Sequence, residues 1–347
     1  KRAYMELSHK QIESLKEMLA QPRLRIVILS HTNPDGDAVG SSLAWAEVLR
    51  ARGHEVTCVV PNKYPYFLDW MPGIEEVVVF KTDTEGRAVK AIAEADVLFC
   101  LDFNAVSRLE ILSETIQGNT TARRVLIDHH LQPDEGFDIV FSHPESSSTC
   151  FLVYCLVEAM YGTGAITRRM GELLYVGMMT DTGNFAFSHL TPELFRAVAV
   201  LLEKGISIPE IHNSVYNAYT EGRARLFGYA INRKMALIED GTVAYMSLLE
   251  SEMRRFQFQQ GDSEGFVNYA LTIKKVKMSA MFLAHRKFIR ISLRSRGNVD
   301  VNLFARKYFN GGGHKNAAGG KSFLSMEETI DHYIRSVREF AEEGHLG

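Results

Sequence analysis

Five short apolar runs, separated by stretches with helical spacing, dominate the first half of this 347-residue chain. They cover residues 25–30, 55–60, 76–80, 95–101 and 124–127, and together they are rich in Val, Ile and Leu. Runs of this length, bounded by turns and helical segments, are typical of buried strands. Strands that alternate with helices favour a mostly parallel sheet with helices on both faces. We therefore expect the first half of the chain to form a doubly wound α/β domain.

Helical patterns dominate the next part of the chain. Helices are predicted at 147–160, 167–180, 193–203, 209–217 and 221–236, with Thr191 capping the third. From Gly241 onwards the sequence changes to short strands, aromatic stretches and a glycine run. We therefore predict a first domain at 1–215, a helical linker at 216–237 and a smaller second domain at 238–347.

Charge and composition exclude several classes of protein. The chain has 39 Lys+Arg and 42 Asp+Glu, a formal net charge of −3, so no global field attracts nucleic acid or a membrane surface. No apolar run approaches the ~20 residues of a membrane span. The four cysteines, Cys58, Cys100, Cys150 and Cys155, form no Cys-x-x-Cys pair, and residues 1–9 do not resemble a secretory signal. These features predict buried thiols and a cytoplasmic location.

Acidic and imidazole side chains follow three of the predicted strands. The set consists of His31, Asp35, Asp37, Asp102, Asp128, His129 and His130. The first three follow the run 25–30, in a turn before a helix predicted at 38–52; Asp102 ends the run 95–101, and the last three follow 124–127. Each feature alone has an ordinary explanation as a turn or a solvated strand end. Because ligands gather beyond the carboxyl ends of parallel strands, we expect the whole set to converge there.

Asp181 joins this set for an electrostatic reason. It directly follows the helix predicted at 167–180, and the dipole at a helix C-terminus disfavours a carboxylate unless positive charge lies nearby. Carboxylate and imidazole ligands together suit Mn²⁺, with Fe²⁺, Co²⁺ and Zn²⁺ as alternatives and Mg²⁺ as a weaker match. The ligands are too many for one ion. We therefore predict two metal ions ~3.5–4 Å apart that share one carboxylate.

A strongly basic segment occurs in the predicted second domain. Residues 274–321 contain 12 Lys and Arg but a single acid. The strand FIRISLRSR places Arg290, Ser292, Arg294 and Arg296 on one face, and arginine forks match phosphate oxygens. The run Gly-Gly-Gly-His at 311–314 follows, whose backbone amides are suited to an anion-binding nest, extended by the N-terminus of a helix after it. We therefore predict that this domain binds phosphate.

The order and spacing of these motifs resemble the DHH phosphoesterase superfamily, which is named for its Asp-His-His motif. The matching positions are His31-x-x-x-Asp35-x-Asp37, Asp102, Asp128-His129-His130 and Asp181. The segments RISLRSR and GGGHKNAAGG resemble the DHHA1 domain of that superfamily. The layout is similar to the branch of oligoribonucleases (nanoRNases) that also act as 3′-phosphoadenosine 5′-phosphate phosphatases. The resemblance implies an α/β first domain joined by a helical linker to a smaller α/β domain with a mixed sheet.

The resemblance also implies a role for each site residue. One Mn²⁺ would be bound by His31, Asp35 and Asp102, and the other by Asp37, Asp102, His129 and Asp181, with Mg²⁺, Co²⁺ or Fe²⁺ as substitutes. The catalytic residues would be His130, which faces the scissile phosphate, Asp128, which orients the histidines, and Asp102, which bridges the metals. Substrate phosphate would be held by His130, Arg294, Ser295, Gly312, Gly313 and His314.

The resulting hypothesis is a two-metal phosphodiesterase. It would hydrolyse short oligoribonucleotides or dinucleotides such as pApA to mononucleotide 5′-phosphates, and also 3′-phosphoadenosine 5′-phosphate. A cyclic-di-AMP phosphodiesterase or another nucleotide phosphatase with the same centre is the alternative among enzymes; a nucleotide-binding sensor and a structural metal protein are the alternatives outside them. The expected partners are short RNA or small nucleotides rather than membranes or long duplexes, and the resemblance suggests a homodimer.

Overall fold

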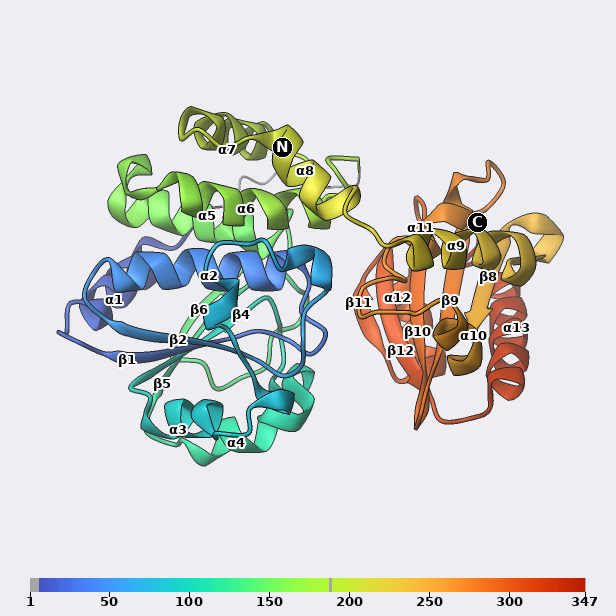
Figure 1. Cartoon of the computed structure of the whole chain (residues 1–347), viewed down its shortest axis with the longest axis horizontal. Helices are drawn as coiled ribbons and strands as arrows, with labels where there is room; N and C mark the ends of the chain where they lie inside the picture. Colours follow the sequence, from blue (N-terminus) through green and yellow to red (C-terminus); the bar gives the residue numbers. More distant parts are fainter. Residues whose placement is uncertain (1–5, 187–188, 347) are drawn as a thin grey trace. The chain divides into compact units, whose positions relative to one another are not determined.

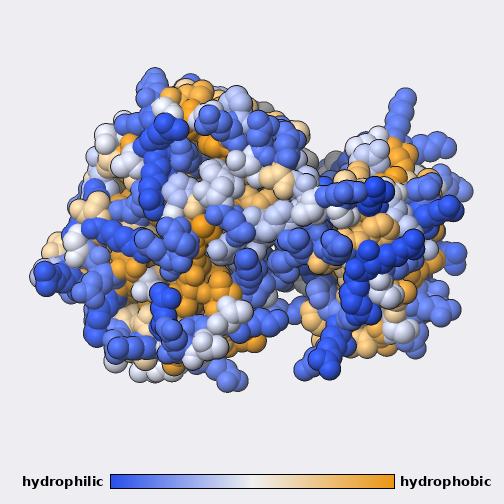
Figure 2. All heavy atoms as spheres, viewed as in Figure 1, coloured by the Kyte–Doolittle hydropathy of each residue, from blue (hydrophilic) through white to orange (hydrophobic). Residues whose placement is uncertain are grey.

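Two compact units make up the chain, which we call the first domain, Lys1–Ala218, and the second domain, Tyr219–Gly347 (Figure 1). The structure is a computed structural model and describes residues 6–186 and 189–346. The surface seen in Figure 2 is mainly hydrophilic, with smaller hydrophobic areas scattered over it. Scattered apolar residues are normal on a protein surface. The large apolar clusters lie inside the two domains.

The first domain is built on a six-stranded parallel sheet. Its strands are β1 (Arg25–Leu29), β2 (Glu55–Val60), β3 (Val78–Val79), β4 (Val97–Leu101), β5 (Arg123–Asp128) and β6 (Ile139–Ser142), in the spatial order β3-β2-β1-β4-β5-β6. The doubly wound α/β fold predicted from the sequence is confirmed. The run at 76–80 yields only the two residues of β3, because 3₁₀ turns at Ile74–Glu76 and Phe80–Thr82 flank it. Strand β6 was not predicted.

Helices cover both faces of this sheet (Figure 1). Helices α2 (Gly36–Arg50), α5 (Thr149–Tyr161) and α6 (Arg168–Asp181) lie on one face, and α3 (Arg87–Glu94) and α4 (Ser113–Gly118) lie on the other. The domain also contains α1 (His9–Leu19), α7 (Pro192–Glu203) and α8 (Ile208–Tyr216). The side chains of Asp35, Ser148, Thr167 and Thr191 cap α2, α5, α6 and α7. A short polar residue before each apolar stretch therefore sets where the helix begins.

Alternate residues of each strand pack on opposite faces of the sheet. Leu29 of β1 belongs to the same buried cluster as Leu98 of β4 and Ile92 of α3. On the opposite side, the ring of Phe99 lies 5.6 Å from that of Trp45 of α2. Because these strands are buried on both faces, their sequences are continuous apolar runs rather than alternating ones.

Helices α2 and α6 approach each other closely at Gly40. A methyl group at this position would lie 2.5 Å from the backbone oxygen of Leu173 and 3.1 Å from Sγ of Cys150. The backbone of α6 cannot withdraw without moving the whole helix, so only glycine fits here. This contact fixes the start of α2, which carries Asp35 and Asp37, beside the end of α6, which carries Asp181.

The second domain contains a mixed sheet, as predicted. Its strands are β7 (Ala236–Ile238), β8 (Val243–Leu248), β9 (Met278–His285), β10 (Phe288–Ser295), β11 (Gly312–His314) and β12 (Ala317–Ser322), in the order β11-β12-β10-β9-β8-β7. Only the β8–β9 pair among these is parallel. Helices α12 (Val301–Phe309) and α13 (Met326–Glu342) share a buried cluster with Ile289, Ile291 and Leu293 of β10. Helices α9 (Glu221–Tyr229), α10 (Glu250–Arg255) and α11 (Phe266–Tyr269) share a separate cluster with Met281 and Leu283 of β9.

The helix expected after His314 is wrong. The chain instead turns back, and β11 pairs with β12 in antiparallel register, with His314 opposite Ala317. Gly313 has a φ of 148°, and a methyl group there would collide with the backbone oxygen of Ala317. The glycine run is therefore needed for a tight hairpin, and it does not lead into a helix.

The predicted linker segment, residues 216–237, contains the whole of α9, a π-helical turn at Ala230–Lys234 and the start of β7.

The four cysteines are free thiols, with Cys58, Cys100 and Cys150 buried and Cys155 half-buried. Among the residues described, no helix has the length and apolar character needed to cross a bilayer.

The close approach at Gly40 predicts a stability difference. Gly40→Ala should lower the free energy of unfolding of the first domain by about 1–3 kcal/mol, because the methyl group overpacks the α2–α6 contact. Gly118→Ala is the matched control, since a methyl group at this α4 position has no atom within 4 Å. It should leave stability unchanged or slightly higher. Urea unfolding followed by circular dichroism measures both, and equal effects would contradict the packing argument.

The buried imidazole of His54 predicts a pH dependence. Its Nδ1 accepts the N–H of Leu24 at 3.3 Å, and burial lowers the pKa of His54 below its ordinary value. The unfolded chain therefore binds this proton at a higher pH than the folded chain, so stability should fall as the pH drops through ~6.5 and below. His54→Gln keeps an acceptor for Leu24 and should lose less stability between pH 7.5 and 5.5 than the wild type. The exposed His9→Gln is the control for removing an imidazole, and identical pH dependence in His54→Gln and wild type would disprove the effect.

Candidate metal centre

The predicted ligands lie where the strand order of the first sheet reverses. Strands β1 and β4 are neighbours at the centre of the order β3-β2-β1-β4-β5-β6, and the chain leaves them in opposite directions across the sheet. In open α/β sheets such a reversal opens a crevice beyond the carboxyl ends of the strands. His31 follows β1, Asp102 follows β4, and Asp128 ends β5. The fold therefore collects these side chains at one edge.

Asp35 and Asp37 lie at the start of α2 rather than in an irregular turn. The helix begins at Gly36, two residues earlier than predicted. Oδ1 of Asp35 accepts the N–H groups of Asp37 and Ala38 at 3.0 Å each, so Asp35 is the N-cap. Asp37 is in the first helical turn and is completely buried. The helix start thus directs the two carboxylates to different places.

Asp102 occupies the centre of the cluster. It is 2% exposed, and its backbone has a φ of 64°, a left-handed conformation that is uncommon for residues other than glycine. Oδ2 lies 3.4 Å from Nε2 of His31, and Oδ1 lies 3.5 Å from Nε2 of His129. The two oxygens of one carboxylate therefore face two different histidines. This is the arrangement that a carboxylate bridging two ions requires.

The ligand atoms fall into two groups, of which the first matches its predicted set and the second matches it except for Asp102. Atoms of His31, Asp35 and Asp102 lie within 4.8 Å of one another, and so do atoms of Asp37, His129 and Asp181. Nε2 of His129 is 3.2 Å from Oδ2 of Asp181 and 3.8 Å from Oδ2 of Asp37. All six predicted metal ligands are thus brought together, and their metal-binding roles stay predictions.

The orientation of the imidazoles tests whether this donor set fits a metal. Nδ1 of His31 lies 2.9 Å from the backbone oxygen of Thr32, and Nδ1 of His129 lies 3.3 Å from that of Ser146. Because a carbonyl oxygen only accepts, Nδ1 carries the hydrogen and the neutral ring has its lone pair at Nε2. Each Nε2 faces carboxylate oxygens, so acceptor would meet acceptor without a cation between them. The donor set therefore fits divalent ions, with the carbonyls holding the rings as in known metal sites.

The cluster strongly perturbs the acidity of its members. Burial and the charges of Asp102 and Asp181 raise the pKa of Asp37 well above its ordinary value, and burial raises the pKa of Asp181 to about 6. Burial disfavours a charged His129, yet the nearby carboxylates of Asp102 and Asp181 raise its pKa overall. Burial also opposes the ionisation of Asp102, but His129 and His31 hold its pKa well below the usual range. The pocket thus favours positive charge, which divalent ions supply more fully than a proton.

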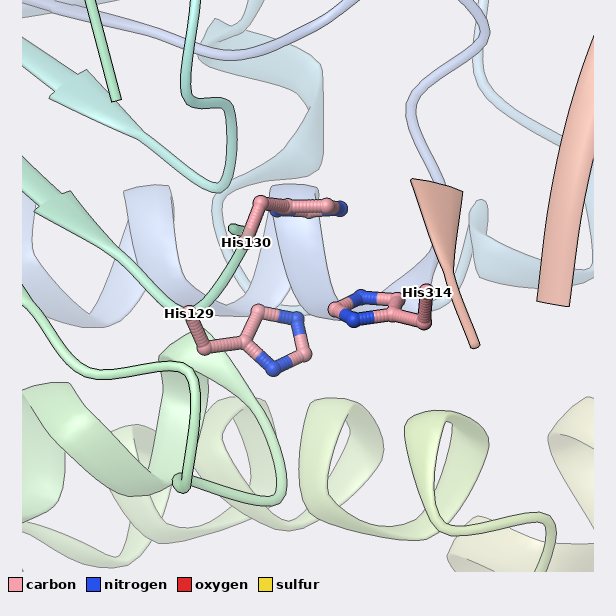
Figure 3. Close-up of side chains that lie close together, drawn as sticks. All are labelled: His129, His130 and His314. Atoms are coloured by element: carbon pink, nitrogen blue, oxygen red, sulfur yellow. The ribbon is translucent and has the colours of Figure 1, made fainter. Parts of the chain in front are cut away.

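His130 is held by Asp128. Its Nδ1 lies 2.7 Å from Oδ1 of Asp128, which is completely buried at the end of β5. Figure 3 shows the imidazoles of His129 and His130 on the loop after β5, and their centroids are 4.9 Å apart in an edge-on arrangement. An ionised Asp128 only accepts, so Nδ1 of His130 carries the hydrogen and Nε2 is its basic nitrogen. Asp128 thus contacts His130, while His129 contacts the carbonyl of Ser146, and the orienting role of Asp128 stays a prediction.

Five of the predicted phosphate-binding residues lie in the second domain, namely Arg294, Ser295, Gly312, Gly313 and His314. Arg294 of β10 and His314 of β11 both pair with Ala317 of β12, so their side chains share one face of the sheet (Figure 3 shows His314 on β11). Ser295 points to the opposite face, where its hydroxyl donates to the backbone oxygen of Val299 at 2.6 Å. The structure therefore brings Arg294 and His314 together within the domain and engages Ser295 elsewhere.

Comparison with known proteins identifies the family. Residues 25–178 match the family model described as DHH family, N-terminal domain, and residues 240–343 match the DHHA1 domain. This chain belongs to the DHH family. The resemblance seen in the motifs is thereby confirmed, and the two matches fall in the first and second domains.

Relatives of this DHH protein include solved and curated proteins. The crystal structure of an exopolyphosphatase-related protein from Bacteroides fragilis superposes with a TM-score of 0.90 at 39% identity, covering 97% of this chain and 98% of that one. The bifunctional oligoribonuclease and PAP phosphatase NrnA of Thermus thermophilus is 28% identical over 90% of this chain and 89% of its own. The cyclic-di-AMP phosphodiesterase GdpP of Bacillus subtilis is 25% identical over 95% of this chain but only 50% of its own length.

Thr149 of the DHH domain contacts two of the acids and was missed in the sequence. Its hydroxyl donates to Oδ1 of Asp102 at 2.9 Å, and its backbone N–H donates to Oδ2 of Asp37 at 2.7 Å. The N–H of Cys150 donates to the other oxygen of Asp37 at 2.7 Å. These amides open α5, where N–H groups lack intrahelical partners and favour an anion. The signal was the run Ser-Ser-Ser-Thr before an apolar helix, shortly after the Asp-His-His motif.

The contact from Thr149 to Asp102 predicts a change in metal affinity. Thr149→Val removes the hydroxyl with little change in shape and should weaken Mn²⁺ binding by about tenfold or more, as loss of a group that orients a ligand does. Thr149→Ser should restore it. Isothermal titration of the metal-free protein with Mn²⁺ measures both.

The neighbouring Ser148 provides the control. Its Oγ accepts the N–H of Phe151 at 3.0 Å and caps α5 without contacting a predicted ligand. Ser148→Ala should therefore cost about 1 kcal/mol of stability and leave Mn²⁺ affinity unchanged. Equal loss of affinity in Ser148→Ala and Thr149→Val would show that the effect arises from the helix terminus and not from the hydroxyl on Asp102.

Proposed function

We propose that this protein is a two-metal phosphodiesterase that hydrolyses short oligoribonucleotides and linear dinucleotides such as pApA to mononucleotide 5′-phosphates. The observation that carries the proposal is the position of Asp102, whose two oxygens face two separate groups of ligand atoms. A structural site for one ion needs no such shared carboxylate. Membership of the DHH family places the reaction among the hydrolyses of phosphate esters.

The proposed cofactors are two Mn²⁺ ions. His31, Asp35 and Asp102 would hold one, and Asp37, Asp102, His129 and Asp181 the other. When bound, such a pair supplies Lewis acidity toward phosphoryl oxygens and lowers the pKa of coordinated water. Mg²⁺, Co²⁺ or Fe²⁺ could bind to the same oxygen and nitrogen ligands as substitutes for Mn²⁺.

The chain's own residues would bind and orient the phosphate group. His130 presents a basic Nε2, and its hydrogen bond to Asp128 would keep the ring in one orientation and stabilise it when protonated. In the second domain, Arg294 and His314 share a face, which suits them to contact oxygens of the same substrate phosphate. Stabilising charge that develops on these oxygens is the main contribution such groups make to rate.

The relatives support this substrate class and also a second candidate. The NrnA relative is named for action on oligoribonucleotides and PAP, and the alignment covers most of both chains. The GdpP relative is named for cyclic-di-AMP, and it matches this chain over 95% of its length. A cyclic-dinucleotide phosphodiesterase is therefore the second candidate.

We also propose that the protein is located in the cytoplasm and that it forms a homodimer.

A substrate panel tests the proposal. The purified protein is assayed at matched concentrations of pApA, a trinucleotide, 3′-phosphoadenosine 5′-phosphate and cyclic-di-AMP, each with Mn²⁺, with Mg²⁺ and with chelator. We expect the linear dinucleotide and trinucleotide to be hydrolysed fastest with Mn²⁺, and no turnover with chelator. Faster turnover of cyclic-di-AMP would favour the second candidate. Tight binding without turnover of any of them would favour a sensor.

Replacing the shared carboxylate tests the mechanism. Asp102→Asn keeps the size of the side chain but removes its charge, and should lower kcat/KM for pApA by at least about 100-fold, the effect of losing one electrostatic contact to the reaction centre. Asp138→Asn is the matched control, since this acid precedes β6 at the opposite edge of the sheet and pairs with Arg123. Circular dichroism verifies that both variants fold. Normal turnover in folded Asp102→Asn would overturn the two-metal proposal.

A further inference from the structure

One face of the second sheet has a strip of small residues with basic residues at both ends. On β10 the residues of this face are Arg290, Ser292 and Arg294, and their partners on β12 are Lys321, Gly319 and Ala317. Gly312 of β11 lies opposite Gly319, beside the side chains of Asn302 and Arg306 of α12. Arg294 stands at one end beside His314, and Arg290 stands directly opposite Lys321 at the other. Between the ends, Ser292 lies opposite Gly319 on β12, and Gly312 on β11 lies next to Gly319.

The domain's own helices cover this strip only in part. The opposite face of β10, with Ile291, is buried against α12 and α13. On the same face as Arg290, the neighbouring strand β9 contributes Met281 and Leu283 to the cluster beneath α9, α10 and α11. Helix α11 also contacts β10, but the residues of β10, β11 and β12 on this face remain half-buried or exposed. The strip therefore lies beside a helical layer, and its small central residues leave the sheet surface partly accessible there. We call this central part the glycine floor.

The basic end formed by Arg290 and Lys321 is electrostatically unusual. Like charges directly opposite each other on neighbouring strands destabilise a sheet. None of the strands β9, β10, β11 and β12 contains an Asp or Glu. One hydrogen bond of Arg290 is from Nη2 to Oγ of Ser263 at 3.2 Å. Its Nε is buried and has no hydrogen-bond partner among the residues that the structure describes, and no carboxylate there forms an ion pair with it.

A partly buried guanidinium without a carboxylate is a good anion site. Burial weakens its hydration, and a phosphate offers it several strong acceptors. Burial lowers the pKa of Arg290, and the charge of Glu264, next to Ser263, opposes this shift without forming an ion pair with Arg290. Lys321 adds a second positive charge on the same face, and the absence of a Cβ at Gly319 leaves room beside both.

We infer that Arg290 and Lys321 form a second phosphate subsite, distinct from the one assigned to Arg294 and His314. Arg294 lies four positions after Arg290 along β10, which is about 13 Å in a strand. The two ends therefore bind different phosphate groups of one ligand, whose backbone lies over the glycine floor. The inference rests on the proposed function and narrows its substrate class. The preferred substrate carries at least one phosphate besides the one that is cleaved.

The test compares two dinucleotides that differ by a single phosphate. ApA contains only the scissile phosphate, whereas pApA carries a second one. With Mn²⁺, the wild-type kcat/KM should be higher for pApA than for ApA. The double variant Arg290→Gln/Lys321→Gln should lower kcat/KM for pApA by about tenfold or more, as loss of charge-assisted hydrogen bonds does, and leave that for ApA unchanged. Arg335→Gln on the outer side of α13 is a control for loss of positive charge.

A binding measurement separates this inference from the proposed function. In the presence of chelator, where no hydrolysis occurs, titration of pApA should show about tenfold weaker binding to the double variant than to the wild type. If the wild type hydrolyses nothing but shows this difference, the phosphodiesterase proposal fails and the subsite stands. If the wild type hydrolyses both substrates and the variant loses nothing, or loses equally on ApA and pApA, the subsite is disproved. Thermal melting of all variants excludes a folding defect as the cause.

Discussion

Mutual repulsion among the carboxylates of Asp37, Asp102 and Asp181 is the constraint on which the first domain's architecture depends. Asp37 is completely buried and Asp102 is 2% exposed, so water screens little of this repulsion. The fold offsets it in two ways. The first two amides of α5 and the hydroxyl of Thr149 donate to Asp37 and Asp102, and the imidazoles of His31 and His129 face the same oxygens. These donors lower the repulsion without removing it, so the remaining charge is what makes the pocket a site for cations.

Rigid elements hold this arrangement in place. Asp102 keeps a left-handed backbone conformation, which persists only where surrounding structure enforces it. Here its N–H bonds to the backbone oxygen of Ile127 on the neighbouring strand, and its side chain is held by Thr149. The contact at Gly40 sets the distance between α2 and α6, and therefore between Asp37 and Asp181. A metal centre built in this way depends on the packing of α2 against α6, at Gly40 three residues after Asp37 and at Leu173 eight residues before Asp181.

Much of the fold and of the site could be predicted because the signals are local. Apolar runs ending in Asp102 and Asp128 identify both the strands and the edge at which their acids meet, and Asp181 follows from the helix that ends there. Thr149 was missed because its role arises from a long-range contact with Asp37, and a Ser/Thr run before a helix is normally just a cap. The sequence predicts the start of α2 two residues too late, because Pro-Asp-Gly is a common turn and Asp35 in it is also the N-cap of the helix. The helix after His314 was wrong because a glycine run that allows a nest also allows a hairpin, and only pairing with Ala317 decides between them.

The two domains solve opposite electrostatic problems. In the first domain, excess negative charge is concentrated at the ends of three parallel strands, and cations would neutralise it. In the second, basic residues are spread along a sheet face where glycine and alanine replace bulkier side chains and acids are absent from four strands. A single small anion would need only one end of that face. A ligand with phosphates at intervals would match its whole length. In the proposed function, the spacing of charge along β10 would therefore distinguish an oligonucleotide from a mononucleotide, while the metal ions would act on the scissile phosphate in both.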